Sequence, residues 1–131
     1  MAVSHPIWDM SFLAETDLSG SQFKVVTLGT AAEQVKICTT TDEPLGVLQN
    51  KPGLGQAATV RLLGTTKVVA DGAFASKDLL MVADAYGEVD TATAMNGGSS
   101  TSWQVGKALA TSTGAGDIVE MLIEKQRYSS A

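Results

Sequence analysis

The side chains that most often do chemistry in proteins are scarce in this sequence. There is one histidine, His5, and one cysteine, Cys38. A nucleophile–base–acid triad normally uses a histidine as its base, and His5 lies beside Pro6 near the start of the chain. A zinc site needs several histidine or cysteine ligands, which these two residues do not supply. We therefore predict no catalytic residues, no metal ligands and no cofactor, and we expect Cys38 to be buried as a small apolar side chain.

Acidic side chains are more plentiful, with 14 aspartates and glutamates. Asp84, Glu88 and Asp90 surround Tyr86-Gly87 at the tip of an expected hairpin. Their spacing does not match an EF-hand loop, so calcium binding there stays an open alternative rather than a prediction. Paired catalytic carboxylates also stay open. However, enzymes that cleave polysaccharides usually stack sugars on several aromatic residues, and aromatics make up only 5% of this chain.

One glycine motif, Gly53-Leu54-Gly55-Gln56-Ala57-Ala58, nominally fits a dinucleotide-binding fingerprint. The residues between this motif and Gly64 have the pattern of a strand. No helix is therefore available to bind a phosphate group. We interpret the motif as a hairpin loop.

The elements that must position these residues are short strands. From Gln22 onward, apolar runs alternate with breaks rich in Gly, Asp, Asn and Ser, such as Asn96-Gly97-Gly98. No segment of ten or more residues keeps a helical period, and the best helix candidate is one turn over 30–34. With 131 residues, of which 44% are hydrophobic, the chain suits one domain. Strands spaced by about 8–12 residues predict an all-β fold, either a barrel or a sandwich. Of these we expect a small antiparallel β-barrel over 21–125.

Residues 1–20 differ from the rest. They contain five large apolar side chains but no strand alternation, and they end in the turn-like Asp17-Leu18-Ser19-Gly20. We interpret this segment as an extended N-terminal arm whose apolar residues contact another protein, such as a neighbouring subunit: Ile7, Trp8, Met10, Phe12 and Leu13. The alternative is an N-terminal strand that closes the chain's own barrel. Residues 126–131 are expected to be a polar, peripheral tail.

A weak internal similarity links two parts of the barrel. Residues 45–63 and 105–122 each follow the order strand, glycine loop, strand. One gap is needed to align them, so chance similarity between two hairpins and an internal duplication both remain open.

Charge and hydropathy exclude several classes of protein. The formal net charge is −5, and no cluster of Lys and Arg interrupts the acidic surface, which argues against nucleic-acid binding. No apolar run reaches the ~20 residues that span a bilayer, which argues against a membrane protein. The first residues lack the basic and apolar regions of a signal peptide, so we expect synthesis in a host cytoplasm.

The series of motifs from about Val60 to Ile123 resembles the small capsid decoration, or cement, proteins of tailed bacteriophages. The matching motifs occur in the order found in that family, although an extra Asp precedes Gly72 and the usual Gly before Asp78 is missing. They cover about half of the chain: Val60-Arg61-Leu62-Leu63-Gly64, Val69-Ala70-Asp71-Gly72, Asp78-Leu79-Leu80, Asp84-Ala85-Tyr86-Gly87, Gly106-Lys107-Ala108-Leu109 and Gly116-Asp117-Ile118-Val119-Glu120-Met121-Leu122. The resemblance implies a tulip-like barrel that binds the outer capsid surface as a homotrimer, without catalysis.

We therefore expect a structural virion protein that stabilises the capsid by bridging major capsid protein subunits, and not an enzyme. Two alternatives remain open, and only the second belongs to a different class of protein. One is another β-rich virion or appendage subunit, such as a tail-tube or fibre-base protein. The other is a small ligand-binding or enzymatic barrel, which would need convergent polar side chains that the sequence does not reveal.

Overall fold

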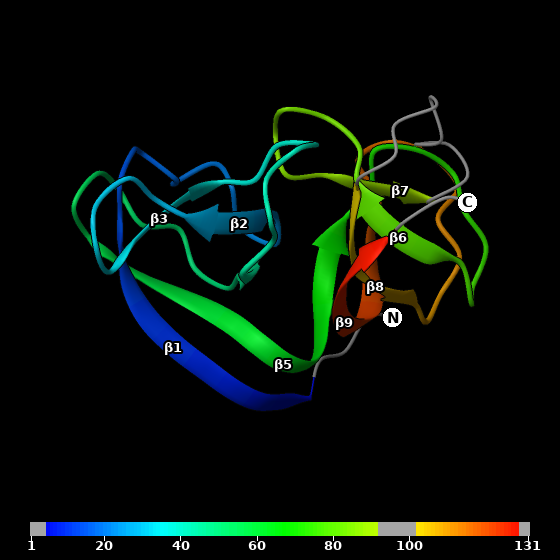
Figure 1. Ribbon diagram of the computed structural model, residues 1–131. Coiled ribbons are helices and arrows are strands. Elements are labelled where there is room, and N and C mark those ends of the chain that lie inside the picture. Colours follow the sequence, from blue (N-terminus) through cyan, green and yellow to red (C-terminus); the bar gives the residue numbers. More distant parts are fainter. Residues whose placement is uncertain (1–4, 92–101, 129–131) are drawn as a thin grey trace.

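The computed structural model describes residues 5–91 and 102–128, and within these ranges the fold is all-β, as predicted (Figure 1). No membrane-spanning helix occurs among the described residues. The described residues contain nine strands in one mixed sheet: β1 (Pro6–Ala14), β2 (Val25–Leu28), β3 (Gln34–Ile37), β4 (Gly46–Leu48), β5 (Ala57–Val69), β6 (Leu79–Val82), β7 (Val89–Thr91), β8 (Ser102–Ala108) and β9 (Ile118–Tyr128).

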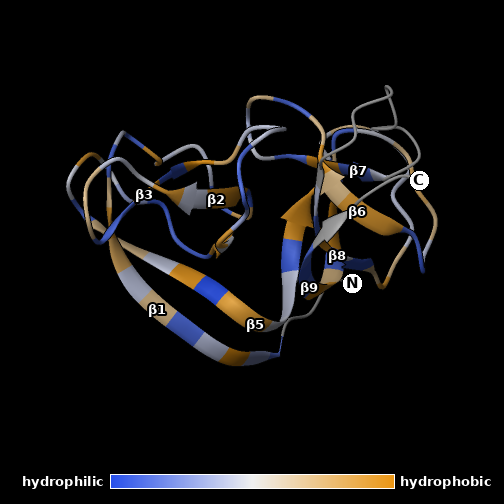
Figure 2. Ribbon diagram, viewed as in Figure 1, coloured by the Kyte–Doolittle hydropathy of each residue, from blue (hydrophilic) through white to orange (hydrophobic). Residues whose placement is uncertain are grey.

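The long strand β5 connects two halves of the molecule. The two apolar runs that the sequence shows on either side of Gly64 are one continuous strand of 13 residues. Gly64 has a φ of 105°, a conformation that side chains disfavour, and it lies where the pairing of β5 changes from β1 to β9. The part before Gly64 pairs with β1 and β4, and it includes three consecutive buried residues, Val60, Arg61 and Leu62. Figure 2 shows that hydrophobic and hydrophilic residues both occur along this part of β5. The part after Gly64 pairs with β9.

The first half closes into a ring of five strands in the order β1-β3-β2-β4-β5, because β5 also pairs with β1. Four of the five pairings are antiparallel, whereas β1 pairs with β3 in parallel at Leu13 and Ala14. The barrel is therefore mixed, and not purely antiparallel as expected. Closure of the ring pairs only part of the edges that an open sheet would leave, because β3 reaches β1 only at Leu13 and Ala14.

The second half repeats this topology. Its order is β5-β9-β8-β6-β7, and an isolated parallel bridge between Ala70, just after β5, and Val89 in β7 closes it. β5 thus serves as the last strand of the first ring and the first strand of the second. The pairings match strand for strand: β1 and β5, β2 and β6, β3 and β7, β4 and β8, β5 and β9 occupy equivalent places.

The equivalence extends to single hydrogen bonds. The Phe23 amide donates to the Leu48 carbonyl at 2.7 Å, and the Lys77 amide donates to the Ala108 carbonyl at 2.8 Å. Both Phe23 and Lys77 have positive φ angles. Ala14 accepts from Gly55 N–H and Ala70 accepts from Gly116 N–H, at 2.9 and 2.8 Å. Of the two explanations for the sequence similarity, this agreement favours duplication, and we call the halves the first and second repeats.

A pair of glycines shows why the motifs of the two repeats look alike. Gly46 in β4 and Gly106 in β8 each lie against a carbonyl oxygen of the next strand, that of Arg61 and that of Leu122. A side chain at either position would collide with that backbone. Glycine is therefore required where β4 and β8 cross the strand beside them.

Each repeat has its own hydrophobic core. Strands β2 and β4 separate the cores, since Val25 and Val47 face the second core while Val26 and Leu48 face the first. Cys38 belongs to the second core and is fully buried, which confirms its predicted role. Burial and the nearby Asp42 raise the pKa of its thiol to about 12, so it stays protonated near neutral pH.

Three local expectations differ from the structure. Residues 6–14 form strand β1 of the first ring rather than an unpaired arm, which agrees with the alternative of a barrel-closing strand. The last strand continues through 126–128 and pairs with β8, so the polar tail does not begin at residue 126. Residues 30–33 form a turn and no helix, and residue 34 already begins β3. The expected turn at Asn96-Gly97-Gly98 and residues 129–131 lie outside the described ranges.

Candidate functional site

The residues predicted as an interface lie together on β1. Four of them are exposed, with Ile7 at 76%, Trp8 at 50%, Leu13 at 46% and Met10 at 39% of their full accessible surface. Phe12 is half-buried and packs against the first core. Opposite Trp8 on β5 lies Leu63, which is also exposed and which sequence reasoning did not include. A strand that pairs along most of its length thus keeps a large apolar surface in water.

The side chains of β1 divide between two faces. Met10 and Phe12 lie opposite Val60 and Ala58, which are core residues, so this face points inward. Asp9 and Leu13 lie opposite Arg61 and Ala57 on the outer face. The sequence hides this alternation because the register shifts twice, between Pro6 and Trp8 and between Trp8 and Asp9.

An ion pair attaches β1 to β5 on the outer face. Arg61 donates from Nε and Nη2 to the two carboxylate oxygens of Asp9, at 2.9 and 3.1 Å. Its Nη1 donates to the Thr65 carbonyl at 3.2 Å. The Arg61 side chain is 9% exposed and that of Asp9 is 30% exposed, so the guanidinium depends on this carboxylate for its neutralisation.

One edge of β1 has few partners. Within the described ranges, β3 pairs with that edge only at Leu13 and Ala14. The edge from Ile7 to Phe12 has no strand beside it in that part of the structure. Backbone groups at such an edge can pair with a strand of another molecule, and the exposed side chains around them are apolar.

The acidic cluster in the structure differs from the set considered from the sequence, which was Asp84, Glu88 and Asp90. Carboxylate oxygens of Asp71, Asp84 and Glu88 lie within 4.8 Å of one another, so these three residues could hold a cation. Asp71 replaces Asp90 in this group because the Ala70–Val89 bridge brings the end of β5 to the hairpin. The pKa of Asp71 is raised by burial and by the charge of Asp84. That of Glu88 is raised by burial and by Asp84, against the opposing effect of Lys24 at 3.3 Å.

Comparison of the two repeats explains why the carboxylates of the acidic cluster lie close together. In the first repeat, the equivalent place holds Glu15 and Thr30, and Glu15 accepts hydrogen bonds from the Thr30 amide and hydroxyl at 2.6 and 2.8 Å. In the second repeat, Asp71 and Asp84 take these positions. Asp84 also accepts hydrogen bonds from the amides of Tyr86 and Glu88, which shapes the hairpin. The cluster therefore has a structural role that does not require a ligand.

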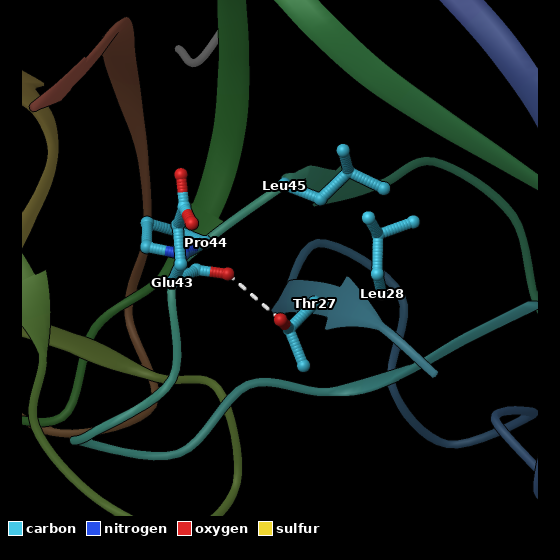
Figure 3. Close-up of a pocket in the computed structure, with 5 residues that line it drawn as sticks. All are labelled: Thr27, Leu28, Glu43, Pro44 and Leu45. Atoms are coloured by element: carbon cyan, nitrogen blue, oxygen red, sulfur yellow. Dashed lines mark hydrogen bonds between the residues drawn. The ribbon is translucent and has the colours of Figure 1, made fainter. Parts of the chain in front are cut away.

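A shallow depression of about 170 Å³ lies beside β2 and the segment before β4 (Figure 3). Its lining residues are Thr27, Leu28, Glu43, Pro44 and Leu45. The Thr27 hydroxyl donates to the Glu43 carbonyl at 2.7 Å and is thereby occupied. Pockets that bind small molecules usually hold roughly 300–1,000 Å³ with several convergent polar groups. The depression is smaller than this and offers few such groups.

The two residues considered for nucleophilic chemistry lie apart. His5 is exposed, and its amide donates to the Thr65 hydroxyl at 2.7 Å. Cys38 is enclosed in the second core. No strong sequence signal marked Arg61 or Leu63 as functional, since their partners on β1 are more than fifty residues away.

No protein-family model matches the chain, and no curated protein matches its sequence. A solved structure is similar in fold, the N base of the head fiber gp8.5 in bacteriophage phi29. The two structures superpose with a TM-score of 0.68 over 89% of this chain and 93% of the other, at 13% sequence identity. The chain therefore has the fold of a phage head fiber base.

Proposed function

We propose that this chain is a structural protein of a bacteriophage virion that binds the outer surface of the capsid and stabilises it by bridging major capsid protein subunits. The similarity in fold to the N base of a phage head fiber carries the proposal, because it extends over nearly the whole of both chains. The motif series from about Val60 to Ile123, which resembles capsid decoration proteins, points in the same direction independently of the fold.

The surface of β1 supplies the contact in this proposal. Ile7 and Trp8, with Leu63 opposite Trp8, place exposed apolar side chains beside an edge with few strand partners. An extended segment of a capsid protein would pair with the backbone of this edge and cover these side chains. In this proposal the protein acts by burying surface at its contact with the capsid and catalyses no reaction, so we propose that it is not an enzyme.

A second candidate function is the base of a longer head appendage. The specific observation that favours it is that the similar structure is itself the base of a fiber. As a base, the domain would use the same β1 surface on the capsid and would carry a further protein on its opposite side. Both candidates place the chain on the head, whereas the tail-subunit alternative does not.

The test is binding to phage heads. Purified protein should co-sediment with DNA-filled heads of the phage whose genome encodes it, and electron microscopy should show added density on the outer capsid. Heads decorated with the protein should also resist heating or chelation longer than bare heads. Density on the tail alone, or none on any part of the particle, would exclude both candidates.

A surface variant makes this test specific for β1. Trp8→Ala together with Ile7→Ser should weaken binding to heads by at least about tenfold, since burial of each large apolar side chain contributes roughly 1.5–3 kcal/mol. Leu54→Ser is a matched control, because Leu54 is 70% exposed but lies in the loop before β5. Equal binding by both variants would place the capsid contact elsewhere on the protein.

A further inference from the structure

The contact between the two repeats provides a template for contact between molecules. In this contact, Val25 and Val47 of the first repeat complete the core of the second. Gln49 of the first repeat donates a hydrogen bond to the Thr66 hydroxyl at 2.8 Å. As a result, the inward-facing residues Thr66 and Val68 are fully buried.

The equivalent inward-facing residues of the first repeat lack this cover. Counting back from the equivalent residues Ala14 and Ala70, Met10 stands at the place of Thr66, and Phe12 at the place of Val68. Met10 is 39% exposed, against 0% for Thr66, and Phe12 is half-buried. The end of the first ring is therefore open where the end of the second ring is closed by the first repeat.

The second repeat carries the matching residues on its far side. Leu79 stands at the place of Val25, since each precedes the residue that pairs with the equivalent glycine, Gly106 or Gly46. Leu109 stands at the place of Gln49. Leu79 and Leu109 are 38% and 43% exposed. The hydrogen-bonded pair Gln49–Thr66 thus corresponds to Leu109 of the second repeat and Met10 of the first, two exposed apolar side chains.

We propose that the protein self-associates head to tail, with Leu79 and Leu109 of one copy packing onto Met10 and Phe12 of the next. The contact is heterologous, because two different surfaces meet, and repetition closes a ring or extends a row. In Figure 1 the arrows of β2 and β6 run in the same general direction, with the repeats side by side. A repeat of another copy that packs onto the first repeat, as the first packs onto the second, would therefore lie on the side of the first repeat that faces away from the second.

The proposed contact between copies reproduces the side-chain contacts between the two repeats but not their backbone contacts. Within the chain, Gly87 closely approaches the backbone of Val25, and the Gly87 carbonyl accepts its N–H at 2.8 Å. Glu33 occupies the equivalent place in the first repeat and has a side chain there. The Glu33 carbonyl accepts a hydrogen bond from the Leu13 N–H of the same chain, at 2.8 Å. Lys107 replaces Val47, and its apolar stem can cover the partner while its ammonium group reaches water.

Sedimentation velocity over a concentration series tests the contact without capsids, so its outcome is independent of the proposed function. The wild-type protein should associate at concentrations up to about 100 μM, the range expected for a weak interface. Met10→Asp should remove the first surface, and Leu79→Asp with Leu109→Asp the second. Each variant alone should associate at least about tenfold more weakly than the wild type.

The mixture of the two variants is decisive. Each retains the surface that the other has lost, so together they should form a one-to-one dimer that does not grow further. Ile118→Asp is the matched control, because Ile118 is 50% exposed but lies outside both surfaces, and it should associate like the wild type. Met10→Thr, which introduces the side chain found at Thr66, replaces Met10→Asp if the latter does not fold by circular dichroism. A monomeric wild-type protein, or a mixture that stays monomeric, would overturn the proposal.

Discussion

The ion pair between Asp9 and Arg61 should hold the N-terminal strand in the barrel, and substitution of Asp9 by Ala tests this. The change leaves Arg61, whose side chain is only 9% exposed, without its carboxylate. Removing one partner of a fully buried pair costs about 3–5 kcal/mol. Because the Asp9 side chain is 30% exposed, water can replace part of the interaction, and we expect a loss of about 1.5–3 kcal/mol in the free energy of unfolding.

The assay is urea denaturation followed by circular dichroism, with the slope of the transition compared between variants. Ser11→Ala is the matched control, since Ser11 is exposed two residues further along β1, and its effect should stay within about 0.5 kcal/mol. The double variant Asp9→Ala/Arg61→Met removes both charges and should recover a large part of the loss.

A particular result would refute this reasoning. If Asp9→Ala lowers the free energy of unfolding by less than about 0.5 kcal/mol, Arg61 does not depend on Asp9 and β1 is held by backbone pairing and packing alone. If the double variant is less stable than Asp9→Ala, the long side chain of Arg61 stabilises the fold by packing rather than through its charge.

Three further predictions follow from the same structure. Deletion of residues 1–15 should abolish the cooperative unfolding transition, because it removes a strand of the first ring and uncovers Val60 and Ala58; a truncated protein with a sigmoidal urea curve would show that β1 is dispensable. Gly46→Ala and Gly106→Ala should each lower stability by about 1–3 kcal/mol, since the new methyl group meets a backbone carbonyl, whereas Gly20→Ala meets no atom and should cost little; equal effects at all three would contradict the crowding argument. Asp71→Asn should stabilise the protein near neutral pH, because the raised pKa of Asp71 means that its charged form disfavours the folded state. Wild-type stability from this group increases as the pH falls through that raised pKa, so the advantage of Asp71→Asn should shrink toward about pH 4, and an advantage independent of pH would contradict it.

The sequence predicts much of the fold because most strands are local. The apolar runs around Val25, Val35, Leu80 and Val119 occur as strands, and the glycine loop at 53–55 connects two paired strands, as expected. Cys38 is buried, since a lone cysteine in an apolar setting behaves as a small hydrophobe. These features depend on composition over a few residues, which a single sequence displays.

What the sequence does not predict depends on contacts between distant residues. The apolar residues of β1 show no period of two because two register shifts interrupt it, so the segment resembles an unpaired arm. The partnership of Asp9 with Arg61 and the approach of Asp71 to Asp84 both depend on how the rings close. The similarity of the two repeats is hard to detect in the sequence. They share few side chains and have in common mainly their glycines and backbone hydrogen bonds.

The sharing of β5 between the rings has a consequence for how the molecule responds to unfolding. Repeats that only stack on one another can fray singly from the end of an array. Here, loss of the second ring would take with it the strand that bears Val60 and Leu62 of the first core. Neither repeat can detach and leave the other complete, and a mechanical pull on one ring passes through the covalent backbone at Gly64 directly into the other.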